Sequence, residues 1–385
     1  MEWKKVNICD MCDSISATYS RGADMVVLIN TSDVLDGKFL NRERVPNKDL
    51  KGQFKKTFQR DDILYSEIRP ANKRFAYVDF DAIDYIASTK LMVLRAKPNV
   101  NPRFLYHILK SEDTLEKLQM LAESRSGTFP QITYSEMANV SVLLPDRATQ
   151  DKIVAILSSL DDKIENNNRI NRNLEAQAQA LFKSWFVDFE PFGGTMPNDW
   201  REGTLGDICK QLKEKVGERD DVKVLSPVTT GKLMLSEEYF TKQVFSQSIA
   251  KYIIVPPTSF AYNPARVNIG SLGMNEYDLD GCVSPVYVVF ECLDGYEYYF
   301  DLFRQTNMFK EEVKLRAIGG VRQSLNYEDF ARITCNIPSK DAIEKFNTIY
   351  LANLNVRNHN SKENNRLAAL RDTLLPKLMK GEIEV

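Results

Sequence analysis

Hydrophobic residues recur at helical spacing through residues 150–185, in the most regular pattern of the chain. Steps of three and four residues visit eleven positions there, and eight of them are apolar. The positions are Gln150, Ile153, Leu157, Leu160, Ile164, Asn167, Asn171, Leu174, Ala178, Leu181 and Trp185. The residues between them are mainly charged or amide side chains, so one helix face is apolar and the other polar. This heptad pattern is typical of a coiled coil and predicts a helix of about 36 residues, ~54 Å long.

A second stripe of the same kind occupies residues 343–378, and six of its eleven positions are apolar. The positions are Ile343, Phe346, Tyr350, Asn353, Arg357, Asn360, Asn364, Leu367, Arg371, Leu374 and Leu378. Val356 and Leu370 lie one position away, which indicates that this apolar stripe drifts around the helix. Pro376 lacks a backbone N–H and is predicted to kink or end the helix near Leu375.

The two stripes belong to an internal repeat with an offset of 193 residues. Eight residues recur identically at this offset, without a gap, over about sixty residues. They are Gly127, Tyr134, Ala138, Pro145, Asn167, Asn171, Leu174 and Leu181, matched by Gly320, Tyr327, Ala331, Pro338, Asn360, Asn364, Leu367 and Leu374. Further upstream, Trp3 pairs with Trp200, and Ile8 pairs with Ile208 or Leu205. The predicted domains are therefore two globular units, 1–145 and 193–337, each followed by a helical segment, 146–192 and 338–385.

Each globular unit alternates short apolar and β-branched runs with turn residues, a pattern that indicates strands. The strand candidates are Met25–Asn30, Ile63–Ser66, Leu91–Arg95, Val140–Leu144, Tyr252–Val255, Phe260–Tyr262 and Val286–Glu291. Helical spacing is also present in Phe104–Leu121 and, more weakly, in Tyr298–Phe309. The predicted fold class is α+β, with two mixed α/β domains joined by two long antiparallel coiled-coil helices in a pseudo-two-fold repeat.

Four asparagines lie at the middle of the two stripes: Asn167 and Asn171 in the first, Asn360 and Asn364 in the second. Antiparallel pairing brings these polar positions together, and buried asparagines at seam positions fix the register of a helix pair. Parallel pairing would also match them, but the second globular unit would then have to span the full ~54 Å helix length. The alternative is that the asparagines face water beside a frayed seam.

Antiparallel helices would hold the two globular units apart as a spacer. Two similar units at a fixed separation can read two half-sites on one DNA duplex when the spacing is near one helical turn, about 34–36 Å. Because the units differ in sequence, the predicted target is bipartite and asymmetric.

Composition restricts the functions that the chain can have. No stretch approaches the ~18 apolar residues of a membrane span, and no apolar signal-peptide core follows residues 1–5. We therefore expect a cytoplasmic protein whose six cysteines are free thiols. There are only two histidines, and Cys9 and Cys12 have no second pair at zinc-site spacing, so we expect neither a metal nor a cofactor.

The sequence also lacks the motifs of the relevant catalytic classes. An adenine amino-methyltransferase needs an Asn/Asp-Pro-Pro-aromatic loop and a glycine-rich cofactor turn, and neither occurs. The nearest string, Tyr262–Ala265, lacks the second proline and the aromatic residue and is predicted to be a turn. No Gly-x-x-x-x-Gly-Lys-Ser/Thr motif is present for ATP binding. The chain is therefore predicted not to be an enzyme.

Charge is balanced over the whole chain, with a net value of −2, but it is unevenly distributed. Residues 37–60 carry eight basic side chains and two acidic ones, whereas residues 198–337 carry 16 basic and 20 acidic. Base reading requires Arg, Lys, Asn and Gln side chains on loops. The candidates for DNA contact are Lys55, Lys56, Arg69, Asn72, Lys73, Arg74, Arg125, Gln131, Asn263, Arg266, Asn268, Arg316, Arg322 and Gln323. For each of them the alternative is an ordinary solvated loop residue.

Four strings in the helical segments and at their borders carry a family resemblance. They are Leu144–Ile153, Leu157–Ile164, Leu181–Phe186 and Leu374–Ile383. Together with the two opening tryptophans, with Asp62–Tyr65, and with Gly127 and Gly320, they make the whole chain similar to the specificity subunit of type I restriction-modification systems. The chain departs from that pattern at Asp61, where glycine is expected, and at Ile343, Arg357 and Arg371 in the second helix.

The resemblance implies two target-recognition domains on double-stranded DNA and two conserved helices. It also implies two modification subunits that bind S-adenosylmethionine and restriction subunits that use ATP. The alternative function is a structural adaptor whose two globular units bind proteins rather than DNA. The salt dependence of duplex binding distinguishes these functions, because only phosphate contacts release counterions.

Overall fold

The computed structural model describes residues 3–48, 50, 52–125, 128–239, 246, 248–316 and 324–385. The chain forms two compact units, which are described separately. Unit 1 consists of Met1–Asn167 and Lys362–Val385, and unit 2 of Asn168–Ser361. Both units contain helices and strands, so the α+β class predicted from the sequence is confirmed.

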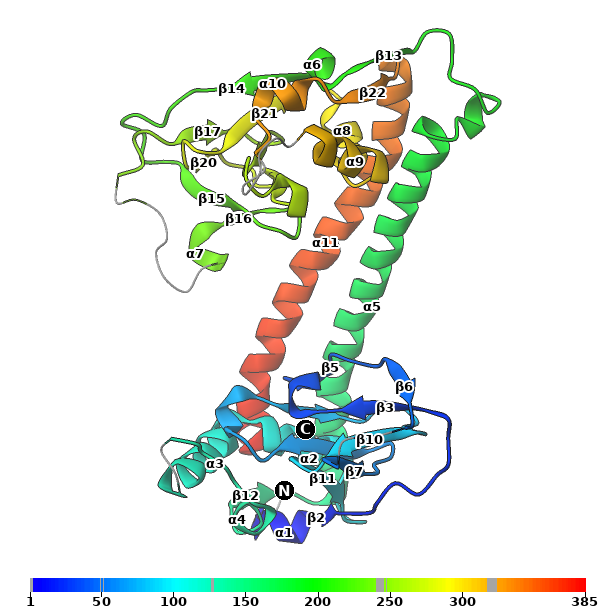
Figure 1. Cartoon of the computed structure of the whole chain (residues 1–385). Helices are drawn as coiled ribbons and strands as arrows, with labels where there is room; N and C mark the ends of the chain where they lie inside the picture. Colours follow the sequence, from blue (N-terminus) through cyan, green and yellow to red (C-terminus); the bar gives the residue numbers. More distant parts are fainter. Residues whose placement is uncertain are drawn as a thin grey trace. The chain divides into compact units, whose positions relative to one another are not determined.

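Unit 1 is built on two four-stranded sheets (Figure 1). Its strands are β1 (Lys4–Asn7), β2 (Cys12–Ile15), β3 (Met25–Ile29), β4 (Val34–Leu35), β5 (Lys38–Phe39), β6 (Arg44–Pro46), β7 (Phe54–Lys56), β8 (Asp62–Ser66), β9 (Phe75–Tyr77), β10 (Tyr85–Ser88), β11 (Leu91–Ala96) and β12 (Ser141–Leu144). One sheet has the order β2-β11-β8-β9 and is antiparallel throughout. The other has the order β6-β3-β10-β7, with β3 and β10 parallel. Every residue of β8 is buried, which places this strand at the centre of the unit.

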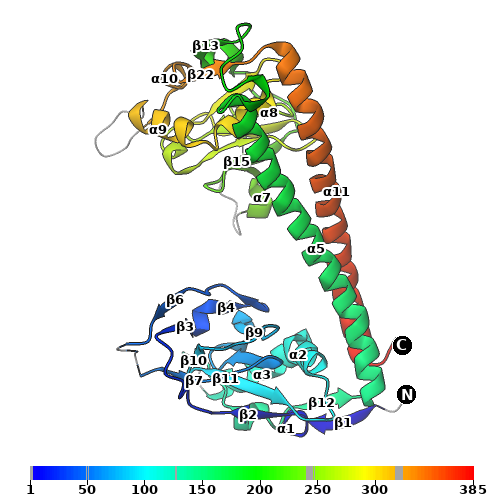
Figure 2. The ribbon, with the colours of Figure 1, turned by 90° about the vertical axis from the view of Figure 1, so that its right-hand side faces the viewer.

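The helices of unit 1 connect these sheets to the long helical segment. They are α1 (Ile8–Met11), α2 (Pro102–Lys110), α3 (Glu112–Arg125) and α4 (Tyr134–Met137), with 3₁₀ turns η1 (Thr31–Asp33) and η2 (Pro70–Asn72). The predicted helical stretch Phe104–Leu121 is divided between α2 and α3, because Ser111 has extended backbone angles. β1 pairs with β12, which leads into the first turn of helix α5 (Figure 2). Phe104 and Leu105 of α2 share a core cluster with Ile153 and Leu157 of α5, so α5 is anchored to the sheets.

Unit 2 repeats the two four-stranded sheets and the terminal strand pair of unit 1, and among its described residues it has no counterpart of the β4–β5 hairpin. Its elements are β13 (Arg201–Thr204), β14 (Cys209–Leu212), β15 (Lys223–Pro227), β16 (Leu233–Leu235), β17 (Ile253–Val255), β18 (Phe260–Tyr262), β19 (Leu272–Met274), β20 (Gly281–Val283), β21 (Val288–Cys292), β22 (Thr334–Ile337), α6 (Leu205–Ile208), α7 (Ser236–Tyr239), α8 (Glu297–Phe303), α9 (Asn307–Arg316), α10 (Tyr327–Ala331), η3 (Glu190–Phe192) and η4 (Val267–Ile269). The sheet orders β14-β21-β18-β19 and β16-β15-β20-β17 correspond to those of unit 1, including the single parallel pair. Because α1 begins at Ile8 and α6 at Leu205, the partner of Ile8 is Leu205 rather than Ile208.

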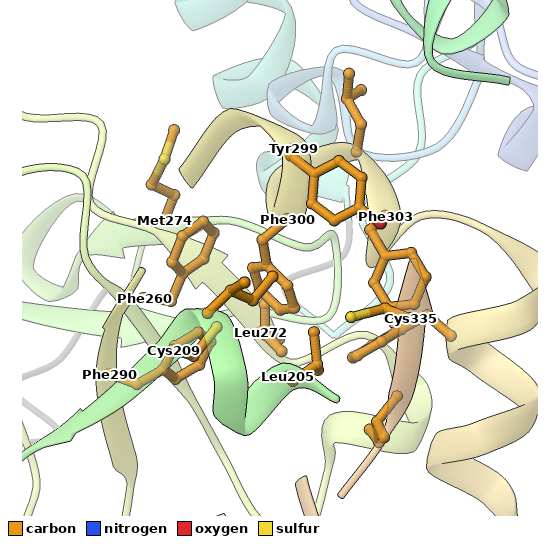
Figure 3. Close-up of a cluster of buried hydrophobic side chains, with 14 of the residues drawn as sticks. Leu205, Cys209, Phe260, Leu272, Met274, Phe290, Tyr299, Phe300, Phe303 and Cys335 are labelled. Atoms are coloured by element: carbon orange, nitrogen blue, oxygen red, sulfur yellow. The ribbon is translucent and has the colours of Figure 1, made fainter. Parts of the chain in front are cut away.

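The core of unit 2 is rich in aromatic rings (Figure 3). Phe260 of β18 stacks on Phe290 of β21 at a centroid distance of 5.3 Å, and Phe300 of α8 meets Phe290 edge-on at 5.3 Å. Tyr299 lies beside them and donates a hydrogen bond from its hydroxyl to the carbonyl of Asn336 at 2.6 Å. Aromatic pairs of this geometry add about 0.5–1.5 kcal/mol each beyond their buried area. The predicted helical stretch Tyr298–Phe309 is divided between α8 and α9.

Two helices of 40 residues each, α5 (Arg147–Phe186) and α11 (Lys340–Met379), carry the two hydrophobic stripes (Figure 1). No seam position of either stripe is exposed, as heptad spacing predicts. Val356 and Leu370 are exposed at 46% and 47%, so the predicted drift of the second stripe is wrong. The boundary between the two compact units falls inside both helices.

Pro376 does not end α11, which was one of the two outcomes predicted for it from the sequence. The helix continues to Met379. Leu378 and Met379 are buried in the core of unit 1, at 1% and 6% exposure. Burying two large apolar side chains contributes about 1.5–3 kcal/mol each, which offsets the ~3 kcal/mol cost of a proline in a helix.

Within each unit the segments of α5 and α11 run antiparallel and meet through polar side chains. In unit 1, the amide of Asn167 donates to Asn364 at 3.0 Å and to Glu363 at 2.7 Å. In unit 2, the amide of Asn360 donates to Asn171 at 2.9 Å. Each unit also has an ion pair between the two helices. In unit 1, Arg371 of α11 pairs with Asp161 of α5, and in unit 2, Arg357 of α11 pairs with Glu175 of α5.

Candidate nucleic-acid interface

The polar turn that follows β8 in unit 1 is held in an unusual backbone conformation. Arg69 and Lys73 flank η2 with positive φ angles of 44° and 53°, in the left-handed region that non-glycine residues seldom adopt. Long-range hydrogen bonds hold this turn, among them one from Arg69 N–H to the Pro130 carbonyl at 3.1 Å and one from Ala71 N–H to the Gln119 side chain at 3.0 Å. Strained backbone of this kind persists only where its surroundings determine it, and it is concentrated at functional sites.

Four of the predicted DNA-contact residues meet around this turn. Arg69 is exposed, and its guanidinium donates to the Thr128 carbonyl at 3.2 Å. Asn72 is exposed in η2, and Gln131 lies opposite Ile68 in an isolated β-bridge. Arg125 ends α3, which packs on η2, and forms an exposed ion pair with Glu136 at 3.4 Å. We name Arg69, Asn72, Arg125 and Gln131 the first turn surface.

Three other basic candidates of unit 1 bind groups within the unit. Arg74 donates to the carbonyls of Ser32 and Val34 at 3.1 and 3.2 Å, and so positions the β4–β5 hairpin. Lys73 forms an ion pair with Glu112 at 2.8 Å, and this hydrogen bond raises the pKa of the lysine. The Lys56 ammonium donates to two carbonyls, at 3.0 and 2.9 Å, and burial lowers its pKa.

Lys55 is exposed on β7, next to Lys56. This strand is an edge of the sheet β6-β3-β10-β7, whereas η2 follows β8 of the other sheet. The structure therefore does not place Lys55 and Lys56 in the first turn surface.

The equivalent turn of unit 2 follows β18. The side chain of Asn263 accepts a hydrogen bond from Ala265 N–H at 3.0 Å and thereby closes the turn before η4. Arg266 and Asn268 are exposed, and we name them the second turn surface. Gly270 ends η4 with φ 93°, and a side chain there would meet the Thr229 carbonyl at 2.7 Å.

The remaining candidates of unit 2 are less informative. Arg316 ends α9 half-buried and pairs with Glu312 at 2.9 Å. Arg322 and Gln323 lie outside the described residues.

A partly buried tyrosine contact recurs at the same place in both units. The Tyr134 hydroxyl of α4 donates to the Cys12 carbonyl at 2.5 Å in unit 1, and Tyr327 of α10 donates to the Cys209 carbonyl at 2.8 Å in unit 2. Both contacts join the short helix before the last strand to the first strand of the antiparallel sheet. This part of the framework is therefore the same in the two copies.

Sequence reasoning missed the residues that hold the first turn surface in place. Gln119 binds the backbone of Ala71 from 48 positions away, and nothing in its local sequence distinguishes it from other polar helix residues. In unit 2, Arg304 has a similar supporting role: it donates to the Leu272 carbonyl at 3.1 Å and to Asp301 at 2.6 Å.

The part of the chain that the structure describes contains no group of three or more metal-ligating side chains. In the same residues, no helix is long and apolar enough to cross a bilayer.

Comparisons with known proteins agree on one family. The family described as "Type I restriction modification DNA specificity domain" matches residues 1–176. The type I restriction enzyme HindI specificity subunit of Haemophilus influenzae is 34% identical, over 99% of this chain and 100% of its own length. The MjaIX specificity subunit of Methanocaldococcus jannaschii is 26% identical, over 75% of this chain and 71% of its own.

A solved structure shares the fold. The crystal structure of the type I restriction-modification S subunit from M. genitalium superimposes with a TM-score of 0.61 at 16% identity. The match covers 98% of this chain and 96% of that chain.

Proposed function

The chain belongs to the family of type I restriction-modification specificity subunits, and on this premise we propose that it is the non-catalytic DNA-recognition subunit of such a complex. It reads double-stranded DNA and brings modification and restriction subunits to the site. The names of its relatives favour this function over a protein-binding adaptor.

The observation that carries the proposal is the repeated turn that exposes an arginine in each unit. Arg69 lies four residues after the buried Tyr65, and Arg266 lies four residues after the buried Tyr262. Both tyrosines lie on the corresponding strands β8 and β18. An arginine guanidinium is suited to bidentate contacts with guanine or phosphate. Two such turns on one chain fit a target with two half-sites.

The two turn surfaces differ in their side chains, so the half-sites differ as well. The first presents Arg69, Asn72, Arg125 and Gln131, whereas the second presents Arg266 and Asn268. The resulting target is bipartite and asymmetric.

The long helices are proposed to act as an antiparallel spacer whose register is set by the four asparagines. Support comes from their amide pairs, Asn167 with Asn364 and Asn171 with Asn360, formed within the two units. Buried amide pairs at seam positions favour one register over others.

The exposed positions beside the seam of each helix are proposed to dock the modification subunits. On α11, the exposed residues Ile349 and Val356 lie seven positions apart, and Leu370 lies two further heptads along. On α5, Ile156 and Ile170 are exposed at a spacing of two heptads. Apolar residues at heptad spacing on an exposed face suit the packing of further helices.

The test uses the complex assembled with its modification subunits. The recognised sequence is first read from the positions of methylated adenines in a host that carries the complex, and duplex affinity is then measured as a function of salt. Arg69→Gln and Arg266→Gln are each expected to cost about 1–3 kcal/mol of binding free energy if the arginine reads a base. If the arginine binds a phosphate instead, the salt slope is expected to fall by about 1.

Arg332→Gln is the matched control, because the Arg332 side chain is 72% exposed in unit 2 and lies outside both turn surfaces. Affinities and slopes that are the same for all three variants would contradict the proposed DNA contacts. Methylation by the isolated chain would contradict the non-catalytic role.

A further inference from the structure

Two cysteines of unit 2 face each other on neighbouring strands. Cys209 of β14 is the register partner of Cys292 of β21, and their Sγ atoms lie 3.5 Å apart. Both are free thiols in the structure. Cys209 is 6% exposed, and Cys292 is partly buried at the edge of the same core.

The strand pairing places these side chains at the separation that a disulfide requires. Leu293 N–H donates to the Ile208 carbonyl at 2.7 Å, so the next opposed pair, Cys209 and Cys292, is of the non-hydrogen-bonded type. In such pairs the Cα atoms are about 4.5 Å apart and the side chains lie closest. That separation lies at the short end of the range of about 4.4–6.8 Å seen for disulfides.

The first repeat has the same backbone frame without the second cysteine. Cys12 of β2 is the register partner of Ala96 of β11, and Lys97 N–H donates to the Met11 carbonyl at 2.9 Å. The cysteine pair is therefore a property of unit 2 and not of the repeated framework.

We propose that Cys209 and Cys292 form an oxidisable dithiol that hydroperoxides convert to an intramolecular disulfide. Cys292, the more accessible thiol, is oxidised first: its sulfur takes one peroxide oxygen to give a sulfenic acid, and hydrogen peroxide is reduced to water. The Cys209 sulfur then attacks the sulfenic sulfur, the S–S bond forms, the S–O bond breaks, and a second water leaves. The proposal does not depend on the DNA-recognition function.

The surroundings of Cys292 make this reaction slow at neutral pH. The hydrogen bond with Cys209 and burial raise the Cys292 pKa well above its usual value, and the carboxylates of Glu297 and Asp301 on α8 act in the same direction. Cys335 on β22 is the other thiol near Cys209, and burial raises its pKa to about 12. Because the thiolate is the nucleophile, the rate is expected to rise about tenfold per pH unit below the pKa.

The disulfide would link the edge strand of a sheet covalently to the neighbouring strand. β14 is the outer strand in the order β14-β21-β18-β19, and edge strands open more readily than central ones. A covalent link to β21 is therefore expected to slow hydrogen exchange in Cys209–Leu212. The equivalent strand of unit 1, Cys12–Ile15, lacks the link and serves as an internal reference.

The experiment treats the folded full chain with hydrogen peroxide, then denatures it and alkylates the remaining thiols. The number of titratable thiols is expected to fall by two from six, with loss of two hydrogen atoms in the intact mass and a linked peptide joining Cys209 to Cys292. Cys292→Ala, which places in β21 the residue that unit 1 has at Ala96, is expected to keep all five of its thiols at the same peroxide dose. Cys335→Ser is expected to lose two thiols, as the wild type does.

A gain-of-function variant gives a second test that does not disturb unit 2. Ala96→Cys creates the same opposed pair with Cys12 and is expected to add a second disulfide on β2 and β11. If wild-type chain keeps six thiols, or loses two that are linked elsewhere or between chains, the proposal is overturned. Equal hydrogen exchange of Cys209–Leu212 before and after oxidation would overturn the proposed effect on the sheet edge.

Discussion

In unit 1, the buried carboxylate of Asp62 pairs with the partly exposed Arg95, and we expect substitution of Asp62 to have a large effect on stability. Its carboxylate, 1% exposed, accepts two hydrogen bonds from Arg95, at 2.7 and 2.8 Å, and a third from Gln59 N–H at 2.9 Å. Asp62→Ala leaves the guanidinium and the amide without their acceptor, and we expect it to lower the free energy of unfolding of unit 1 by about 2–3 kcal/mol. Urea unfolding measures this change.

The matched control is Lys117→Ala, which removes an exposed ion pair with Asp113 on α3. Exposed pairs contribute about 0–1 kcal/mol, so this variant is expected to unfold nearly as the wild type does. If the two substitutions lowered the free energy of unfolding equally, the Asp62 pair would contribute no more to stability than an exposed ion pair does.

His107 gives unit 1 a pH-dependent stability. It is 3% exposed on α2, and burial, helped by Lys110 and Arg103, lowers its pKa well below 6.5. Below pH 6.5 the unfolded chain therefore binds a proton that the folded chain does not, and stability falls as the pH falls. The contribution of one such group is at most about 1.4 kcal/mol per pH unit.

His107→Leu removes this titration. Between pH 6.5 and about pH 5, we expect the free energy of unfolding of the variant to fall less steeply with falling pH than that of the wild type. The two slopes are expected to differ by up to about 1.4 kcal/mol per pH unit, which corresponds to one bound proton. Urea unfolding at a series of pH values measures the slope. Parallel curves for the two proteins would mean that the histidine is protonated in the folded state as well.

At the scale of elements, the paired asparagines of α5 and α11 are coupled. Asn360 is 7% exposed and donates to Asn171 at 2.9 Å. Asn171→Leu leaves a buried amide unpaired, and we expect it to destabilise unit 2 by about 1–3 kcal/mol. The double variant with Asn360→Leu is expected to be more stable than the sum of the single effects, because two leucines can pack together. A double-mutant cycle by chemical denaturation measures the coupling, and strict additivity would contradict it.

The helices and many of the strands could be predicted because their signals are local. Heptad spacing identified the seams of α5 and α11, and the apolar runs gave Ile63–Ser66 and Phe260–Tyr262 as strands. Strand order could not be predicted, because it depends on pairings between distant segments. The parallel pairing of β3 with β10, for instance, joins residues about sixty positions apart.

The same reason explains which parts of the candidate site escaped prediction. Arg69 and Arg266 were identified because each lies in a polar turn directly after a buried strand. The acceptors of Lys56 and Arg74 are carbonyls at separations of 33 and 42 residues in the chain. Such contacts leave no mark in the local sequence, so these cations resembled surface residues.

At the scale of the whole molecule, the repeat implies that recognition divides into two separable parts. Both units have the same sheet order, while their turn surfaces carry different side chains. Each turn surface is therefore expected to read its own half of the target. The binding free energy lost by a substitution in one turn surface is therefore expected not to depend on the base sequence of the half-site that the other surface reads.

This independence can be tested by a cycle between protein and DNA in the complex assembled with modification subunits. Arg69→Gln is measured against duplexes in which either half-site is scrambled, and Arg266→Gln is measured in the same way. The cost of each variant, about 1–3 kcal/mol on the intact site, is expected to disappear on the duplex whose matching half is scrambled and to persist on the other. If Arg69→Gln loses its effect when one half-site is scrambled, and Arg266→Gln loses its effect when the other is scrambled, each unit reads one half-site. If both variants lost their effect on the same half, the two turns would share one half-site and the bipartite assignment would fail.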